Sequence, residues 1–252
     1  MTAPRAEPGR VAWALRRAAE AGEFFDLPAG VADGVVAGPD WHRHADLTAP
    51  GGIPVLTAVV ADHAARLRVA EPRVAASLMF QGYAGRLWSP VLACLRDGIV
   101  LDLDPAALWL RCRPGESVTL RLTAVGGWAS SEPALVTRVV SGRLLAPMVD
   151  AVRRVVPLAA GLLWGNAASA LAGVLLMLSV HDPSARAVHA VARRLLASGP
   201  LAGTGTLAYR GGRPAFRRRS CCLYYRVPGG GLCADCGLVR VPRLRSRSVL
   251  DP

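Results

Sequence analysis

Four cysteines near the end of the chain form a compact group of metal-ligating side chains. Cys221 and Cys222 are adjacent, ten residues follow, and Cys233 and Cys236 form a C-x-x-C pair. Four thiolates this close in sequence, with consecutive glycines between the two pairs, suit a four-coordinate metal ion or an iron–sulfur cluster. The sequence therefore predicts a metal centre in the C-terminal segment.

Three kinds of site are compatible with the cysteine spacing. Disulfides need an oxidising compartment, and residues 1–10 contain no apolar stretch typical of a secretory signal, so we expect a cytosolic chain with free thiols. Zinc sites usually join two C-x2–4-C pairs, whereas one pair here is adjacent and reaches a single ion poorly. Two bridged irons offer ligand positions that are further apart. The spacing favours a cluster, with zinc as the alternative.

The cysteine pattern and two apolar segments resemble the FhuF family of ferric-siderophore reductases. The segments are residues 76–90, ASLMFQGYAGRLWSP, and residues 163–171, LWGNAASAL, and the cysteines follow them as in that family. The resemblance extends over about residues 70–236. It implies a [2Fe–2S] cluster and one-electron reduction of Fe(III) held by a siderophore, typically a hydroxamate, inside the cell. The ligands that it implies are Cys221, Cys222, Cys233 and Cys236.

Six polar or aromatic side chains in the two segments are candidates for lining a siderophore cleft that faces the cluster. They are Gln81, Tyr83, Arg86, Trp88, Trp164 and Asn166. Arg86 has a forked guanidinium suited to a hydroxamate or carboxylate oxygen. A polar group in an apolar segment more often satisfies buried backbone, and an aromatic ring more often fills a core. A structural role for these residues is therefore the stronger expectation.

The charge of the chain limits its partners. The formal net charge is +12, but the arginines are scattered, with short runs only at residues 217–219 and 240–247. No helix-turn-helix or RNA-recognition signature accompanies them, so we expect no nucleic-acid partner. The charge is better suited to attracting an acidic protein or an anionic iron complex.

The source of electrons must be another protein. No G-x-G-x-x-G follows a predicted strand, so we expect an external donor such as a ferredoxin or a flavin-dependent reductase. Two alternative functions stay open: a four-cysteine zinc module that binds nucleic acid or protein, and an iron–sulfur protein for electron transfer or sensing that is not a reductase.

The periodicity of the chain predicts an α+β fold, mostly helical, with a small central antiparallel β meander and a C-terminal cysteine-ligated segment. Proline and glycine positions end several of the elements. Helices are expected over residues 9–23, 55–68, 72–88, 133–140, 144–156, 158–180 and 183–197, with the third ending before Pro90. Strands are expected over residues 98–103, 108–113 and 117–122, a loop over 27–54 and a linker over 199–212. We predict an N-terminal extension (1–70), a siderophore-binding core (71–212) and a cluster segment with a basic tail (213–252).

Residues 158–180 form a 23-residue stretch without a charge, long enough to cross a bilayer. Asn166 near its middle favours a buried core helix over stable membrane insertion, and the family that the chain resembles works on the cytoplasmic side. We therefore expect a cytoplasmic protein, with membrane association as the alternative.

Cys94 and Cys112 have no cysteine nearby in sequence and are expected to be buried, inert thiols.

Overall fold

The computed structural model describes residues 3–30, 38–181, 186–240 and 242. The basic run after Arg240 and the first residues of the helix predicted over 183–197 lie largely outside this part of the chain. The elements, in chain order, are α1 (Pro8–Ala19), β1 (Trp41–Arg43), α2 (His44–Thr48), η2 (Pro50–Gly52), α3 (Ile53–Leu67), α4 (Pro72–Leu95), β2 (Ile99–Leu101), β3 (Leu108–Arg111), β4 (Thr119–Leu122), β5 (Gly127–Ala129), α5 (Pro133–Val136), η3 (Thr137–Leu145), α6 (Ala146–Val155), α7 (Ala160–His181), α8 (Arg186–Leu196), η4 (Gly199–Leu201), β6 (Gly205–Arg210), β7 (Arg213–Arg218) and η5 (Tyr224–Arg226).

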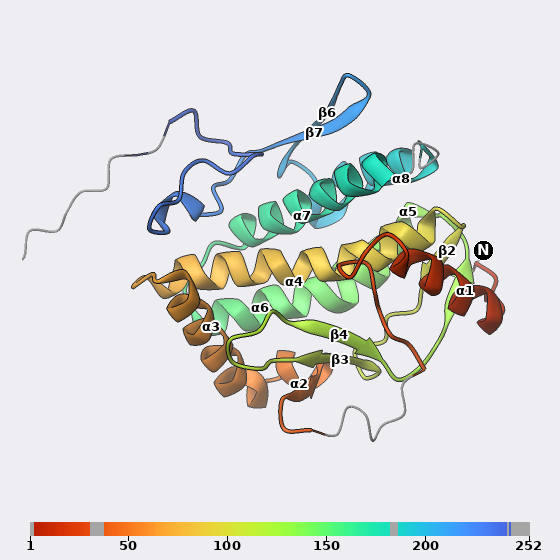
Figure 1. Ribbon diagram of the computed structural model, residues 1–252, viewed down its shortest axis with the longest axis horizontal. Coiled ribbons are helices and arrows are strands. Elements are labelled where there is room, and N and C mark those ends of the chain that lie inside the picture. The colour runs from red at the N-terminus through yellow and green to blue at the C-terminus, as the bar shows by residue number, and fades with distance from the viewer. Residues whose placement is uncertain (1–2, 31–37, 182–185, 241, 243–252) are drawn as a thin grey trace, which may run out of the picture.

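Helix α4 lies at the centre of the molecule. Helices α1 and α3 and the β3–β4 hairpin lie on one side of it, and α7 lies on the other, with the β6–β7 hairpin beyond α7 (Figure 1). Apolar residues occur all round α4 rather than on one stripe, and its largest side chain, Trp88, is fully buried. Such a helix is stable only when other elements cover every face of it. The α+β fold class predicted from the sequence is confirmed.

The predicted end of the central helix is wrong. We expected helix 72–88 to stop before Pro90, but α4 continues through Pro90 to Leu95. Proline removes one helical hydrogen bond and is usually disruptive in a helix interior. Here the residues on both sides of Pro90 are buried in the core, so tertiary packing outweighs the local preference.

The predicted three-stranded meander is only partly present. Strands β3 and β4 pair as expected, but β2 pairs with β5 in a separate two-stranded sheet. The third strand beside β3 is β1, which together with α2 lies inside the stretch predicted to be a loop, residues 27–54. Pairing between strands far apart in sequence depends on how the helices bring those strands together. A local sequence pattern cannot predict this pairing.

The two helices predicted over residues 133–140 and 144–156 form one continuous helical stretch. Helix α5 leads through η3, a π-helical segment, directly into α6. The prediction left residues 141–143 between two helices, but the chain adopts π-helical geometry there instead of ending a helix.

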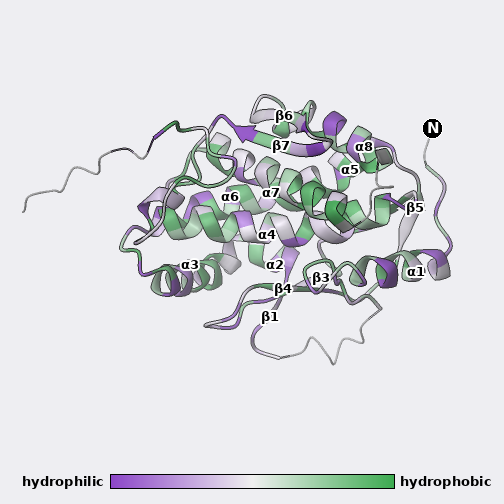
Figure 2. Ribbon diagram, turned by 45° about the horizontal axis from the view of Figure 1, so that its top comes forward, coloured by the Kyte–Doolittle hydropathy of each residue, from purple (hydrophilic) through white to green (hydrophobic). Residues whose placement is uncertain are grey.

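Helix α7 is the element with the length and composition to cross a membrane. Among the described residues it is the one such helix, over Ala160–Val180, and 61% of its apolar window is buried inside the protein. Figure 2 shows α7 coloured as hydrophobic along much of its length, pressed between α4 and the β6–β7 hairpin. This burial agrees with the core helix expected from the sequence.

The glycine-rich stretch predicted as a linker, residues 199–212, instead contains the first strand of a hairpin. Strands β6 and β7 pair in register from Gly205–Arg218 to Arg210–Arg213. The two residues between them, Gly211 and Gly212, have φ of 56° and 78°, as a two-residue type I′ turn requires. The domain boundary predicted after residue 212 falls in this turn, and residues 1–70 contribute side chains to the same core as residues 71–212.

Candidate iron–sulfur site

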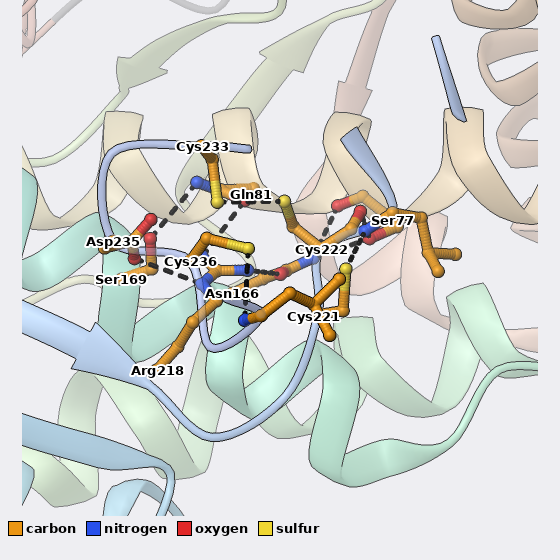
Figure 3. Close-up of polar contacts among 12 residues, drawn as sticks. Ser77, Gln81, Asn166, Ser169, Arg218, Cys221, Cys222, Cys233, Asp235 and Cys236 are labelled. Carbon is orange, nitrogen blue, oxygen red and sulfur yellow. Dashed lines mark hydrogen bonds and ion pairs between the residues drawn. The ribbon is translucent and has the colours of Figure 1, made fainter. Parts of the chain in front are cut away.

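The cysteine segment leaves β7 and lies over one end of the α4–α7 pair. Figure 3 shows the four cysteine side chains gathered above these two helices. Cys222 is 2% exposed, and the other three cysteines are partly exposed. The Ser77 hydroxyl of α4 donates to the Cys222 carbonyl at 2.8 Å, which fixes the adjacent cysteines against the helix. The segment is thus docked on the core and reaches solvent on its outer side.

Two of the sulfur atoms are in direct contact. The Sγ atoms of Cys222 and Cys233 are 3.5 Å apart, and Cys221 is close enough to Cys222 and Cys236 for their charges to affect its pKa. Two sulfurs on one tetrahedral metal ion with bonds of about 2.3 Å would be about 3.8 Å apart. The separation of Cys222 from Cys233 therefore fits two ligands on the same iron.

Backbone N–H groups already point at two of the sulfurs. The N–H of Leu223 donates to Cys221 Sγ at 3.3 Å, and the N–H of Leu238 donates to Cys236 Sγ at 3.4 Å. Leu223 has a φ of 70°, a left-handed conformation that non-glycine residues rarely adopt. That turn directs its N–H back to the sulfur two residues earlier. Hydrogen bonds of this kind stabilise thiolate ligands of iron–sulfur clusters and tune their potential.

Two of the four thiols favour the protonated form when no metal is bound. Burial raises the pKa of Cys221, and burial together with the neighbouring Cys222 and Asp235 raises the pKa of Cys233 strongly. Metal binding must displace these protons. Within the described residues, no three His, Cys, Asp or Glu side chains are grouped closely enough to hold a single metal ion. The donor chemistry, the sulfur separation and the N–H···S bonds fit a [2Fe–2S] cluster that Cys221, Cys222, Cys233 and Cys236 would hold.

A buried arginine joins the cysteine segment to both helices. The side chain of Arg218 has no exposed surface and donates to Asp235 at 3.1 Å, to Asn166 Oδ1 at 2.8 Å and to Gln81 Oε1 at 3.3 Å (Figure 3). The backbone N–H of Arg218 also donates to the carbonyl of Asp235 at 3.0 Å. Partners from α4, α7 and the C-x-x-C turn therefore meet at one guanidinium.

Asp235 is held in its ionised form within this network. Its burial opposes ionisation, but the charge of Arg218 and hydrogen bonds from Ser169, Cys233 and Arg218 outweigh the burial and lower the pKa of Asp235. A fully buried guanidinium without a carboxylate partner would be costly, so the pair depends on both members.

Asn166 uses its whole amide in the same network. Its Nδ2 donates to the Ser77 carbonyl at 2.8 Å and to the Ser77 hydroxyl at 2.9 Å, while its Oδ1 accepts from Arg218. The neighbouring Gly165 allows Ser220 to lie close to α7, because a Cβ at position 165 would be 2.1 Å from Ser220 Oγ. The Gly165-Asn166 pair therefore lets the cysteine segment pack directly on α7.

The six substrate candidates occupy different environments. Gln81 and Asn166 belong to the Arg218 network, and Gln81 also donates to the Ser169 hydroxyl at 3.2 Å. Trp88 is buried and donates to the Ala167 carbonyl at 3.1 Å, and Trp164 packs partly buried against the core. These four side chains therefore make contacts within the protein.

Tyr83 and Arg86 lie on another face of α4. Tyr83 is 3% exposed, and its ring stacks near that of His44 with centroids 6.1 Å apart. The guanidinium of Arg86 lies 4.7 Å from the centre of the Phe24 ring and donates to the Glu23 carbonyl at 3.3 Å. Both residues line a pocket of about 190 Å³ between α3, α4 and the β3–β4 hairpin. Direct contact of the six residues with a siderophore stays a prediction.

Four residues of the site were missed or misjudged from the sequence: Ser77, Ser169, Arg218 and Asp235. Arg218 was assigned to a charge run, yet the neighbouring Arg217 and Arg219 are exposed while Arg218 is buried. The alternation of a strand could have indicated that one arginine of the three points inward. Arg226, which lies between the two cysteine pairs in sequence, forms an ion pair with Glu71 ahead of α4.

The two remaining cysteines lie apart from the cluster segment. Cys94 is fully buried, and that burial raises its pKa to about 12. Cys112 is partly exposed, and burial followed by the charge of Asp40 raises its pKa to about 11. Both thiols are therefore protonated and unreactive at neutral pH.

Comparison with known proteins gives a family match for the cysteine segment. Residues 218–237 match the family model described as the FhuF 2Fe-2S C-terminal domain. The match begins at Arg218 and includes all four cysteines and Asp235. No curated protein matches the chain in sequence.

Proposed function

Because the chain carries the C-terminal [2Fe–2S] domain of the FhuF family, we propose that this iron–sulfur protein is a ferric-siderophore reductase. Its substrate would be Fe(III) bound by a siderophore, most suitably one with hydroxamate groups. The observation that carries the proposal is the match over residues 218–237, on a segment whose four cysteines converge at a partly exposed site.

The chemistry of iron explains why one electron is sufficient. Fe(III) is bound very tightly by hard oxygen donors, whereas Fe(II) is bound more weakly by the same ligand. When bound to the cysteines, the cluster supplies a one-electron reductant, and Fe(III) gains that electron to become Fe(II) without any bond of the siderophore being broken. The protein residues need only bind the complex, hold the cluster ligands and set the electrostatic environment. No general base or nucleophile is required.

An external protein would restore the electron. A ferredoxin or a flavin-dependent reductase is suitable, because the chain is basic and the arginines beside the cysteines, Arg217 and Arg219, are exposed. Both the donor and the released Fe(II) belong to the cytoplasm, where we place the protein.

The first test is the metal content of anaerobically purified protein. Iron, sulfide and zinc are measured, and absorption spectra are recorded before and after dithionite is added. We expect about two irons and two sulfides per chain and visible bands that bleach on reduction. A colourless protein with one zinc that takes up no cluster on reconstitution would reject the proposal in favour of a zinc module.

The second test mixes the reduced protein with a ferric tris-hydroxamate in the presence of an Fe(II) chelator. Stoichiometric re-oxidation of the cluster with Fe(II) release supports the reductase. A cluster that stays reduced in the presence of ferric hydroxamates would instead indicate an electron-transfer or sensor protein.

A further inference from the structure

A pocket of about 190 Å³ lies between α3, α4 and the turn that joins β3 to β4. Helix α4 lines it with Met79, Gly82, Tyr83 and Arg86, which follow the i, i+3, i+4, i+7 spacing of a single helix face. None of the four cluster cysteines is among the described residues of this lining. The pocket is therefore separate from the iron–sulfur site.

We propose that this pocket binds a small carboxylate whose apolar body is a single ring. Arg86 and Tyr83 would donate to the carboxylate, and the ring would lie among the apolar side chains of α3 and α4. The inference concerns a second ligand site and does not depend on the proposed reductase function. Three properties of the pocket carry it: its size, an unpaired buried hydroxyl and an uncompensated positive charge.

The volume of the pocket suits a molecule with one ring. An apolar cavity of about 150 Å³ holds benzene, whereas drug-sized molecules occupy sites of about 300–1,000 Å³. Val55, Val59 and Met79 are among the side chains that would contact the ring. A molecule as large as a complete ferric siderophore would not fit inside.

The hydroxyl of Tyr83 is buried without a hydrogen-bond partner. Tyr83 lines the pocket and is 3% exposed, and no described residue bonds to its hydroxyl oxygen. A buried polar group without a partner is costly, and such groups in native proteins usually have one. An acceptor atom of a bound ligand would supply the missing partner.

Arg86 brings a positive charge that no carboxylate of the described residues neutralises. Its guanidinium donates to the Glu23 carbonyl at 3.3 Å and lies 4.7 Å from the centre of the Phe24 ring. A guanidinium matches the geometry of a carboxylate and binds it more strongly than a neutral acceptor. Tyr83 precedes Arg86 by three residues, so both side chains lie on the same face of α4. A carboxylate at this face would gain two donors.

The other charges around the pocket are already paired. Arg66 lies 3.0 Å from Asp62, and Arg113 lies 3.4 Å from Glu116. Asp62 also accepts from the backbone N–H of Gly115 at 2.9 Å, which attaches the β3–β4 turn to α3. The two lining carboxylates therefore offer little to a cationic ligand, and the pocket favours an anion.

The charge preference is tested with three ligands that share one ring. The probe is 4-fluorobenzoate, titrated against the full-length protein and followed by fluorine NMR. The comparison ligands are the neutral 4-fluorobenzamide and the cationic 4-fluorobenzylammonium. We expect the benzoate to bind at least about tenfold more tightly than either. Equal affinity for all three would overturn the selection of an anion, and no binding of any of them would overturn the site.

The location is tested by narrowing the pocket from α3. Ala58 is exposed and lines the pocket, so Ala58→Leu should weaken binding of 4-fluorobenzoate at least about fivefold without disturbing the fold. Ala61→Leu is the matched control, because Ala61 is an exposed alanine of the same helix outside this lining. Equal affinity of wild type and Ala58→Leu would overturn the location.

The cationic contact is tested with Arg86→Gln, which removes the charge and keeps a donor. We expect affinity for 4-fluorobenzoate to fall at least about fivefold and affinity for the neutral benzamide to change little. Arg73→Gln is the control, because it removes the same charge from the exposed start of α4. Wild-type affinity of Arg86→Gln for the benzoate would overturn the role of Arg86.

The hydroxyl contact is tested with Tyr83→Phe, which has a readout that a structural role would not give. Because this hydroxyl has no partner in the protein, its removal should not lower the stability of the ligand-free protein to urea. The same change should weaken binding of 4-fluorobenzoate at least about fivefold. A loss of stability with unchanged affinity would overturn the assignment of Tyr83 to the ligand.

Discussion

At the scale of single residues, Arg218 sets the electrostatic environment of the site. Its side chain is fully buried, and its charge acts on Cys221 as well as on Asp235. A positive charge held in a region of low dielectric stabilises added negative charge far more than one in solvent does. Because reduction adds an electron to the cluster, Arg218 should raise its reduction potential.

We predict that Arg218→Gln lowers the reduction potential by on the order of 50 mV, equivalent to about 1 kcal/mol for one electron. Glutamine keeps hydrogen-bonding capacity toward Asn166 and Asp235 while removing the charge. The potential is measured by a dye-mediated titration followed by absorption or electron paramagnetic resonance.

The control for Arg218 is Arg217→Gln, which removes the same charge from the exposed neighbour. Solvent screening should make its effect small. Equal shifts in the two variants would show that net charge, rather than the buried position of Arg218, determines the potential.

At the scale of elements, α2 is attached to the core through a buried histidine. His44 is fully buried, and its Nε2 lies 3.1 Å from the Leu144 carbonyl at the end of η3. That carbonyl accepts, so Nε2 carries the proton, and Nδ1 is buried without a hydrogen-bond partner among the described residues. Burial lowers the pKa of His44 to about 4, although the bond to Leu144 opposes the change.

We predict that this histidine makes stability depend on pH. Its pKa is depressed in the folded state, so the unfolded chain binds more protons between the folded value of about 4 and the unfolded value of 6.5. The stabilising contribution is complete above the unfolded value and is lost as the pH falls. Between pH 7 and pH 5 the loss should be about 2 kcal/mol, and it should be absent in His44→Gln.

The measurement is urea unfolding of the cluster-loaded protein at both pH values, followed by far-UV circular dichroism. Any effect of acid on the cluster is common to both proteins, so the difference between their pH dependences isolates His44. The same loss of stability in wild type and His44→Gln would contradict the prediction.

At the scale of the whole molecule, the excess of positive charge bears on the electron donor that we propose. The formal net charge is +12, and Arg217 and Arg219, close to the cysteines in sequence, are exposed. A basic surface attracts an acidic protein from a distance. We therefore expect an acidic electron donor to be favoured.

We predict that reduction of the protein by an acidic ferredoxin becomes slower with salt. The second-order rate constant should fall at least about tenfold between low and high ionic strength, because screening weakens attraction between the two proteins. Stopped-flow absorption at the cluster bands measures it. The double variant Arg217→Gln with Arg219→Gln should show a weaker salt dependence. A rate constant independent of salt in the wild type would argue against electrostatic recruitment of the donor.

The sequence by itself was sufficient to predict the metal centre and its ligands. The cysteine spacing predicted a metal centre, and the resemblance to the FhuF family implied the [2Fe–2S] cofactor. Hydrophobic periodicity predicted the α+β fold, because ligand spacing and periodicity are local properties of the chain. The sequence also contained the Gly211-Gly212 turn signal, which was interpreted as part of a linker.

Only the tertiary structure decided which polar residues serve the site. Arg218 and Asn166 lie 52 residues apart and meet at the base of the cysteine segment, and Ser77 lies 89 residues from Asn166. No local pattern records contacts between residues so far apart. The same holds for the continuation of α4 through Pro90 and the pairing of β1 with β3, since packing energy from distant elements outweighs the local preference for a break or a loop.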